Sequence, residues 1–278
     1  MQSFLLFVLF CCVLLLDHAY GSEGVRWAVA YGNDYTQKQL RPYSILVFES
    51  HEHPSLKQFV GQNKTLLAYL SLGEIENHRS YFKQAQQAGF LLEKNPHWLD
   101  SYFVDLRDAR WAKMVIEELI PAILYQRFDG LFIDTLDNAV YLEQLDPEKY
   151  KGMREAAIHL MRAVRLHYPQ IKIILSRALG ILPEVAPDID MLVGESLYTD
   201  YDSATKSYRT VPAEVFQQHL KQMRNAKAKN TNLQLFSLDY WDPDDPTTIR
   251  KIYEIERGRG LIPYVSTWQL NVIIPEPP

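Results

Sequence analysis

The sequence predicts an α/β fold, a single (β/α)8 TIM barrel, from its length and from a regular alternation of apolar runs with helical patterns. The chain has 278 residues, of which 47% are hydrophobic, and a barrel of this kind takes roughly 250 residues. Eight short runs are too apolar to have one solvent-facing side, as expected of parallel strands covered by helices. They are residues 26–32, 43–49, 65–74, 130–137, 171–178, 190–198, 233–241 and 261–268.

Helical patterns fill the gaps between these runs. Residues 109–128 precede the fourth run and residues 146–168 follow it, while residues 212–229 and 245–260 follow the sixth and seventh. A doubly wound open sheet is the alternative, but no G-x-G-x-x-G follows the first run, which weakens its nucleotide-binding version. No Ser/Gly-rich linker interrupts the pattern, so we expect residues 22–278 to form one domain.

The N-terminal residues predict a secretory signal peptide. Residues 3–16 form an uninterrupted apolar run of 14 residues, shorter than the ~20 needed to span a bilayer. Ala19 and Gly21 place small residues at positions −3 and −1 of a cleavage site before Ser22. We therefore expect residues 1–21 to be removed and the mature protein to be secreted or periplasmic, without membrane association. An uncleaved anchor is the alternative, because the first three residues carry no Lys or Arg.

Composition excludes several classes of protein. Cys11 and Cys12 are the two cysteines of the chain and both lie in the expected signal peptide. Removal of that segment deletes Asp17 and no basic residue, so the net charge changes from −5 to −4. Without a basic stripe, nucleic acid is not an expected partner. The His-Glu-His sequence at 51–53 has no apparent third ligand, so we expect neither a metal nor another cofactor, and we expect a monomer.

Polar residues gather where the apolar runs end. In a barrel, the C-terminal ends of all strands meet at one mouth, where the chemistry takes place. Carboxylates and hydroxyls there can bind sugar hydroxyls, aromatic rings can stack on sugar faces, and two acids can act across a glycosidic bond. The candidate site residues are Tyr31, Glu49, Ser71, Glu74, Asp134, Asp137, Arg177, Glu195, Tyr198, Asp239, Tyr240 and Trp268.

Asp134 and Glu195 are the strongest catalytic candidates, because each directly follows buried strand residues at the expected mouth. The other charged candidates also have structural interpretations. Asp137 could cap the next helix, Glu74 could bind a backbone amide of the loop that follows it, and Arg177 could be the counter-ion of one of the acids.

Six motifs, taken in order, resemble those of glycoside hydrolase families 114 and 166. They are "AYLSLGE", "NPHW" followed by "VDLRDARW", "FDGLFIDTLD", "ILPEV", "GESLY" and "LDYWDP", and the resemblance runs from about Trp27 to Ile274. It implies cleavage of α-1,4 linkages in polymers of galactosamine and N-acetylgalactosamine by paired acids that match Asp134 and Glu195. Two positions depart from the family pattern: Ser176 stands where Asn is expected, and Asn271 where an acid is usual.

These observations lead to the hypothesis of a secreted, endo-acting and retaining glycosidase that cleaves an amino-sugar exopolysaccharide. Alternate strands of an eight-stranded barrel can bring two carboxyl groups to the ~5–5.5 Å separation of a retaining mechanism. We assign Asp134 as the nucleophile and Glu195 as the general acid/base, with a pKa raised by the neighbouring carboxylate. A non-catalytic sugar-binding barrel and a structural partner of a polysaccharide machine are the alternatives.

Overall fold

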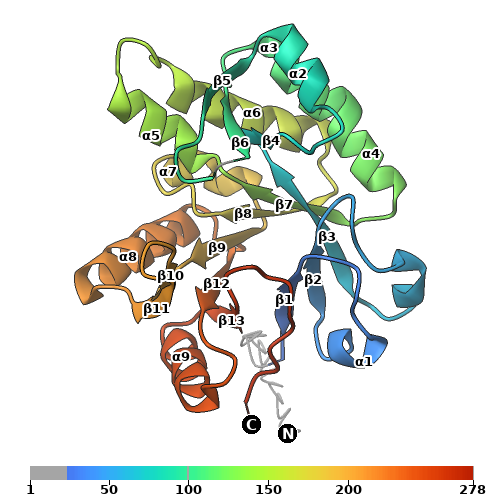
Figure 1. The fold of residues 1–278 in the computed structure, drawn as a ribbon, viewed down its shortest axis with the longest axis vertical. Coiled ribbons are helices and arrows are strands. Elements are labelled where there is room, and N and C mark those ends of the chain that lie inside the picture. Colours follow the sequence, from blue (N-terminus) through green and yellow to red (C-terminus); the bar gives the residue numbers. More distant parts are fainter. Residues whose placement is uncertain (1–23, 99, 278) are drawn as a thin grey trace, which may run out of the picture.

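The eight apolar runs form one parallel sheet in the computed structural model, which describes residues 24–98 and 100–277. Each strand lies within its predicted run, and the strands follow one another in chain order around the molecule (Figure 1). The predicted barrel architecture is therefore confirmed. The strands are β1 (Trp27–Ala30), β2 (Ile45–Phe48), β3 (Thr65–Ser71), β7 (Gly130–Asp134), β8 (Lys172–Ser176), β9 (Met191–Glu195), β12 (Gln234–Tyr240) and β13 (Ile262–Ser266).

The barrel closes at a seam between β1 and β13. Ladder pairing connects β1 through to β13 in the described sheet but does not join these two ends. Instead, the indole nitrogen of buried Trp27 donates to the Ile262 carbonyl at 3.0 Å. The Trp27 ring also packs edge-on against Phe236 and Tyr264, with centroid distances of 5.3 and 5.9 Å. Packing and single hydrogen bonds, rather than strand pairing, hold the nearly closed barrel together at this point.

The predicted helical stretches are also present and lie on the outer side of the strands (Figure 1). Residues 109–128 contain α3 (Ala109–Met114), a π-helical turn (Val115–Leu119) and α4 (Ile120–Tyr125). The π-helical turn leads into Pro121, which lacks the N–H that a continuous α-helix would need. The other predicted stretches contain α6 (Met153–His167), α8 (Ala213–Lys229) and α9 (Pro246–Gly258).

Two antiparallel additions follow barrel strands at the mouth. After β3 the chain forms a small sheet in the order β4-β6-β5, and after β9 it forms the hairpin β10-β11. The bounds are β4 (Glu74–Glu76), β5 (Leu91–Lys94), β6 (Ser101–Val104), β10 (Thr199–Asp202) and β11 (Ser207–Thr210). The shorter helices are α1 (Gln37–Leu40), α2 (Phe82–Ala88), α5 (Asp137–Leu145) and α7 (Leu182–Val185), with 3-10 turns at Leu56–Phe59 and Ala186–Asp188.

None of the helices in the described part of the chain has both the length and the apolar character that crossing a bilayer requires. The expected signal peptide, residues 1–21, lies outside the described residues.

Candidate active site

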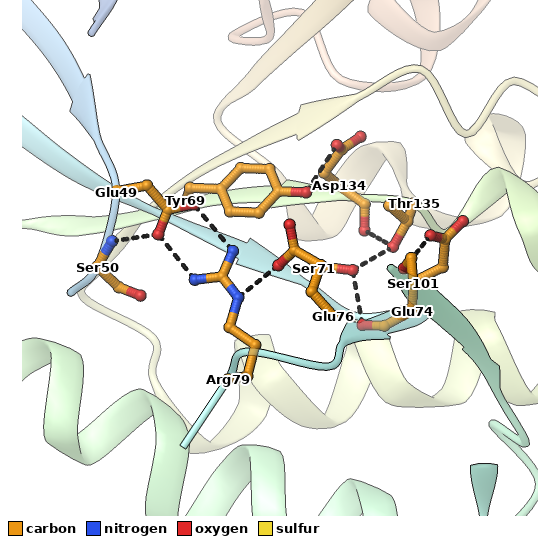
Figure 2. Close-up of polar contacts among 10 residues, drawn as sticks. All are labelled: Glu49, Ser50, Tyr69, Ser71, Glu74, Glu76, Arg79, Ser101, Asp134 and Thr135. Atoms are coloured by element: carbon orange, nitrogen blue, oxygen red, sulfur yellow. Dashed lines mark hydrogen bonds and ion pairs between the residues drawn. The ribbon is translucent and has the colours of Figure 1, made fainter. Parts of the chain in front are cut away.

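Asp134 is the last residue of β7, and the residue after it fixes its position. Thr135 has a left-handed backbone (φ 67°) that turns the chain sharply away from the strand. The Thr135 hydroxyl donates to the Asp134 carbonyl at 2.7 Å and accepts the Gly73 N–H at 2.8 Å. Asp134 is thus held at the rigid end of a barrel strand, with its carboxylate at the mouth (Figure 2).

Glu195 takes the equivalent place two strands further along the sheet, at the end of β9. Its Oε1 accepts a hydrogen bond from the Tyr240 hydroxyl at 2.5 Å, and its Oε2 accepts one from the Ser176 hydroxyl at 3.1 Å. Ser176 ends β8 between the two acids. The residue that departs from the family pattern is therefore a direct partner of Glu195.

The two carboxylates interact electrostatically. Burial, and after it the charges of Glu195 and Asp137, raise the pKa of Asp134 to about 8. Asp134 therefore favours its protonated form near neutral pH. A carboxyl pair with one proton is the charge state from which one group can donate a proton while the other attacks.

The raised pKa favours the protonated form of Asp134, whereas the sequence analysis expected the raised pKa at Glu195. The two acids also differ in their hydrogen bonds. Two hydroxyl groups donate to Glu195, those of Tyr240 and Ser176. Among the described side-chain hydroxyls, only that of Tyr69 donates to Asp134, and this bond is longer, at 3.2 Å.

Tyr69 is a site residue that the sequence analysis missed. It lies on β3, and its hydroxyl donates to Asp134 Oδ2 (Figure 2). Tyr31 packs edge-on against its ring at a centroid distance of 5.5 Å, which places Tyr31 beside Tyr69. The available signal was the two-residue period of a strand, because Tyr69 shares the face of Ser71, which was selected.

Three neighbouring strands end in the same backbone feature. Thr135, Arg177 and Ser196 directly follow β7, β8 and β9, and all three have left-handed conformations, with φ of 67°, 54° and 48°. Such conformations are costly for residues other than Gly and concentrate at functional sites. Their position around the two acids supports this mouth as the active site.

Asp137 and Arg177 form the rim beside the acid pair. Arg177 Nε lies 3.7 Å from Asp137 Oδ2, and the side chains are 48% and 40% exposed. Asp137 begins α5, whose N-terminus has no side-chain capping bond in the described structure. Both residues are thus available to a ligand. Trp268 also lies on the rim and stacks on Tyr201 of the β10-β11 hairpin, at 5.1 Å between ring centroids.

Glu74 and Ser71 are buried and form hydrogen bonds within the protein, which corrects their expected role as sugar ligands. Buried Glu74 accepts bonds from Asn95 and Asn138 at Oε1, at 2.7 and 2.5 Å, and from Ser101 at Oε2, at 2.5 Å. The Ser71 hydroxyl bonds to the Glu74 carbonyl and to the Thr135 hydroxyl, each at 2.8 Å (Figure 2). These bonds tie β3 and β4 to the turn after Asp134.

Asp239 and Tyr198 lie between the barrel and its helices, which is a second correction. Asp239 is fully buried, and its Oδ1 accepts the backbone N–H groups of Tyr198 and Thr199 at 2.8 and 2.6 Å. The Tyr198 ring packs edge-on against Phe216 of α8. Successive strand residues point to opposite faces, so Tyr240 faces the mouth and its neighbour Asp239 faces outward.

The described residues contain no group of three His, Cys, Asp or Glu side chains placed to hold a metal ion. His53, of the His-Glu-His sequence, bonds instead to the Pro54 carbonyl at 2.9 Å and to the Gln126 side chain at 3.1 Å.

Comparison with known proteins identifies the family of this chain. The family model of glycoside hydrolase family GH114 matches residues 18–275, nearly the whole chain. The chain belongs to this family. The predicted resemblance to family 114 is therefore confirmed, and the protein is a glycoside hydrolase by family.

Two sequence relatives are described only as uncharacterized proteins. One, from Deinococcus radiodurans, is 26% identical over 218 residues, which cover 77% of this chain and 67% of the relative. The other, from Thermotoga maritima, is 23% identical over 236 residues, which cover 78% of this chain and 69% of the relative.

Two solved structures share the fold. The glycoside hydrolase domain of PelA from Pseudomonas aeruginosa superposes with a TM-score of 0.79 at 23% identity, over 89% of this chain and 96% of the domain. Ega3 from Aspergillus fumigatus, solved in complex with galactosamine, gives a TM-score of 0.66 at 14% identity, over 89% of this chain and 93% of Ega3.

Proposed function

We propose that this member of family GH114 is a secreted, endo-acting and retaining hydrolase that cleaves α-1,4-linked galactosamine and N-acetylgalactosamine polymers. The observation that carries the proposal is the pair of Asp134 and Glu195, which end strands two apart and each accept a hydrogen bond from a tyrosine hydroxyl. Burial and the Glu195 charge also raise the pKa of Asp134. A sugar-binding module would tolerate the loss of either acid.

In the proposed reaction Asp134 attacks the anomeric carbon while Glu195 gives its proton to the glycosidic oxygen of the leaving chain. Glu195 then takes a proton from water, whose oxygen attacks the same carbon and releases Asp134. Attack requires the ionised form of Asp134, so a proton held there must move to Glu195 when substrate binds. A cationic sugar amine beside Asp134 favours that shift, because a nearby positive charge stabilises the carboxylate.

The charges at the mouth support an amino-sugar substrate. Asp134, Glu195 and Asp137 raise the pKa of Arg177 although burial opposes its charge, so carboxylates outnumber this guanidinium locally. A partly deacetylated polymer carries ammonium groups that such a mouth attracts. The structural similarity to Ega3, which was solved with galactosamine, supports the same class of sugar.

Secretion and endo action are the parts of the proposal that rest on sequence. The apolar run at 3–16 and the small residues before Ser22 support export, and N-terminal sequencing of the mature protein tests it. A start at Met1 in membrane-bound material would show a retained anchor instead.

The activity is tested by incubating the mature protein with partially deacetylated α-1,4-galactosaminoglycan. We expect oligomers to be released, and proton NMR should show that the first product keeps the anomeric configuration of the substrate. Inverted product would make Asp134 a general base. Binding without release of oligomers would show a non-catalytic sugar-binding barrel.

A further inference from the structure

Arg79 is a buried cation beside the active site that the reaction does not use directly. It lies in the segment between β4 and α2 and is 7% exposed. Its Nη1 and Nη2 donate to the two carboxylate oxygens of Glu49, at 2.7 and 2.8 Å, and its Nε pairs with Glu76. Glu49 is therefore paired with Arg79 through both oxygens, and its role as a sugar ligand stays a prediction.

The guanidinium of Arg79 lies over the ring of Tyr69, with its carbon atom 5.7 Å from the ring centroid (Figure 2). The hydroxyl of the same ring donates to Asp134 Oδ2 at 3.2 Å. A continuous series of contacts thus runs from Glu49, at the end of β2, through Arg79 and Tyr69 to the catalytic carboxylate. Burying a charge is costly. An arginine that served only to pair with two acids would cost less free energy at the surface.

We propose that Arg79 is a positioning residue that acts through Tyr69: anchored by Glu49, it fixes the Tyr69 ring so that the hydroxyl donates to Asp134. This proposal deepens the proposed function and rests on it for its catalytic consequence. Neither Arg79 nor Tyr69 was selected from the sequence.

The physical effect has two parts. Cation–π contact holds the ring in one orientation, and the positive charge strengthens the phenol as a donor. Burial and the Asp134 charge raise the pKa of Tyr69, so its hydroxyl keeps its proton, while Arg79 acts in the opposite sense. The donated bond stabilises the ionised form of Asp134, which is the form that attacks.

Asp134 has other charged or titratable neighbours, and none of them duplicates this donor. The groups that interact with it electrostatically, from the elements around the mouth, are Tyr31, Tyr69, Asp137, Arg177, Glu195 and Tyr240. Of these, only Tyr69 has a side-chain hydrogen bond to Asp134 among the described residues.

A double-mutant cycle on kcat tests the route through Tyr69. Tyr69→Phe keeps the ring and removes the hydroxyl, and we expect kcat to fall about 10- to 100-fold, the range expected for a hydrogen bond to a charged group. Arg79→Lys keeps the charge but loses the planar two-pronged pair, and we expect a smaller loss with KM little changed. The double variant should lose no more than Tyr69→Phe alone.

Two matched controls separate positioning from general destabilisation. Arg165→Lys changes a partly buried arginine whose Nη2 binds Asp190 at 2.7 Å, next to β8 but away from the acids. Tyr43→Phe removes a buried hydroxyl whose partner is the Ile274 carbonyl. Both variants should lower the unfolding temperature and leave kcat nearly unchanged. Multiplied losses in the double variant, as for two independent structural defects, would overturn the proposal.

A titration that needs no activity completes the test. With ¹³C-labelled aspartate in the mature protein, and Asp134→Asn to assign the signal, NMR follows the Asp134 carboxyl as the pH changes. Tyr69→Phe should raise its pKa by about one unit, because the ionised form loses a donor, and Arg79→Lys should raise it less.

No movement of the Asp134 titration in Tyr69→Phe would refute the inference even if the polymer is cleaved. An inactive wild-type protein with the expected shifts would refute only the proposed function. If Arg79→Lys does not fold, Glu49→Gln replaces it as the anchor variant.

Discussion

Each of the two strand-end acids is held by one tyrosine hydroxyl, Tyr69 for Asp134 and Tyr240 for Glu195. The two bonds differ in length, 3.2 and 2.5 Å. The shorter bond and the additional donor Ser176 stabilise negative charge on Glu195. Burial raises the pKa of Asp134 to about 8, and changes in these hydroxyls should shift it.

Removal of either carboxylate should abolish most of the activity. We expect Asp134→Asn and Glu195→Gln each to fold normally and to lower kcat roughly 10³-fold or more, since each removes an essential partner in the reaction. Asp137→Asn, on the exposed rim, should lose much less. Steady-state kinetics on a defined oligomer, with circular dichroism to check folding, measures all three. Full activity of either of the first two variants would exclude that residue from the mechanism.

The raised pKa of Asp134 predicts a loss of activity at alkaline pH. Asp134 loses its proton as the pH rises through about 8. The general acid is then missing, so kcat/KM should fall above that pH. Glu195→Gln removes the neighbouring charge and should lower the pKa of Asp134 toward its ordinary range, as measured by carboxyl NMR. An unchanged Asp134 titration in that variant would show that burial alone raises the pKa.

At the scale of single residues, sequence identified the acid pair but not the direction of every side chain. Asp134 and Glu195 could be selected because each ends an apolar run. Asp239 and Tyr240 could not be told apart, because adjacent residues of a strand face opposite sides and one step of register exchanges them. In the structure the Tyr240 hydroxyl donates to Glu195, whereas Asp239 is buried on the side of the strand that faces the outer helices.

At the scale of elements, the ends of strands and the turns after them form the site. The turn after β7 is the clearest case, because Thr135 of that turn packs against Gly73 from the segment after β3. A Cβ added to Gly73 would lie 2.1 Å from the Thr135 carbonyl oxygen, so only glycine fits without movement of the backbone. The position of Asp134 thus depends on close contact between two turns.

Gly73→Ala should therefore damage both stability and activity. The clash involves backbone on both sides, so we expect a loss of about 1–3 kcal/mol in the free energy of unfolding and a marked fall in kcat as Thr135 shifts. Gly258→Ala is the matched control, since its added Cβ would have no atom within 4 Å. That variant, at the end of α9, should be neutral or slightly stabilising. Chemical denaturation and kinetics on the two variants make the comparison, and an equally stable and active Gly73→Ala would contradict it.

The eight strands and four long helical stretches were predictable because their apolar patterns are strong. The additions at the mouth were not. Strands β4 (Glu-Ile-Glu), β10 (Thr-Asp-Tyr-Asp) and β11 (Ser-Tyr-Arg-Thr) are short and mostly polar, so no apolar run marks them in the sequence. Glu74 looked like a strand-end ligand because it closes the run 65–74, whereas the chain in fact breaks at Leu72 and Gly73 before β4 begins.

At the scale of the whole molecule, a second group of buried acids lies outside the active site. Burial raises the pKa of Asp239 to about 7, and burial together with the Asp239 charge raises the pKa of Glu256 of α9 to about 9. The unfolded chain releases these protons near pH 4. Between that pH and about 9 the folded protein binds more protons, so its stability should fall as the pH rises.

Glu256→Gln keeps the shape of the side chain and cannot ionise. We expect its unfolding temperature to depend less on pH between 5 and 9 than that of the wild type, with the largest gain at pH 9. Glu254→Gln, an exposed neighbour on the same helix, is the control and should keep the wild-type slope. Thermal unfolding at several pH values provides the measurement, and parallel curves for Glu256→Gln and the wild type would show that this acid is not responsible.

Because Trp27 lies at the seam between β1 and β13, we expect it to limit aggregation. A fully paired barrel has no edge strands, but here two strands keep unpaired backbone groups wherever ladder bonds are missing. When the Trp27 indole releases the Ile262 carbonyl, both edges become templates for pairing with another molecule. Aggregation of the protein under mild heating should therefore begin at this seam, while the rest of the barrel is still folded.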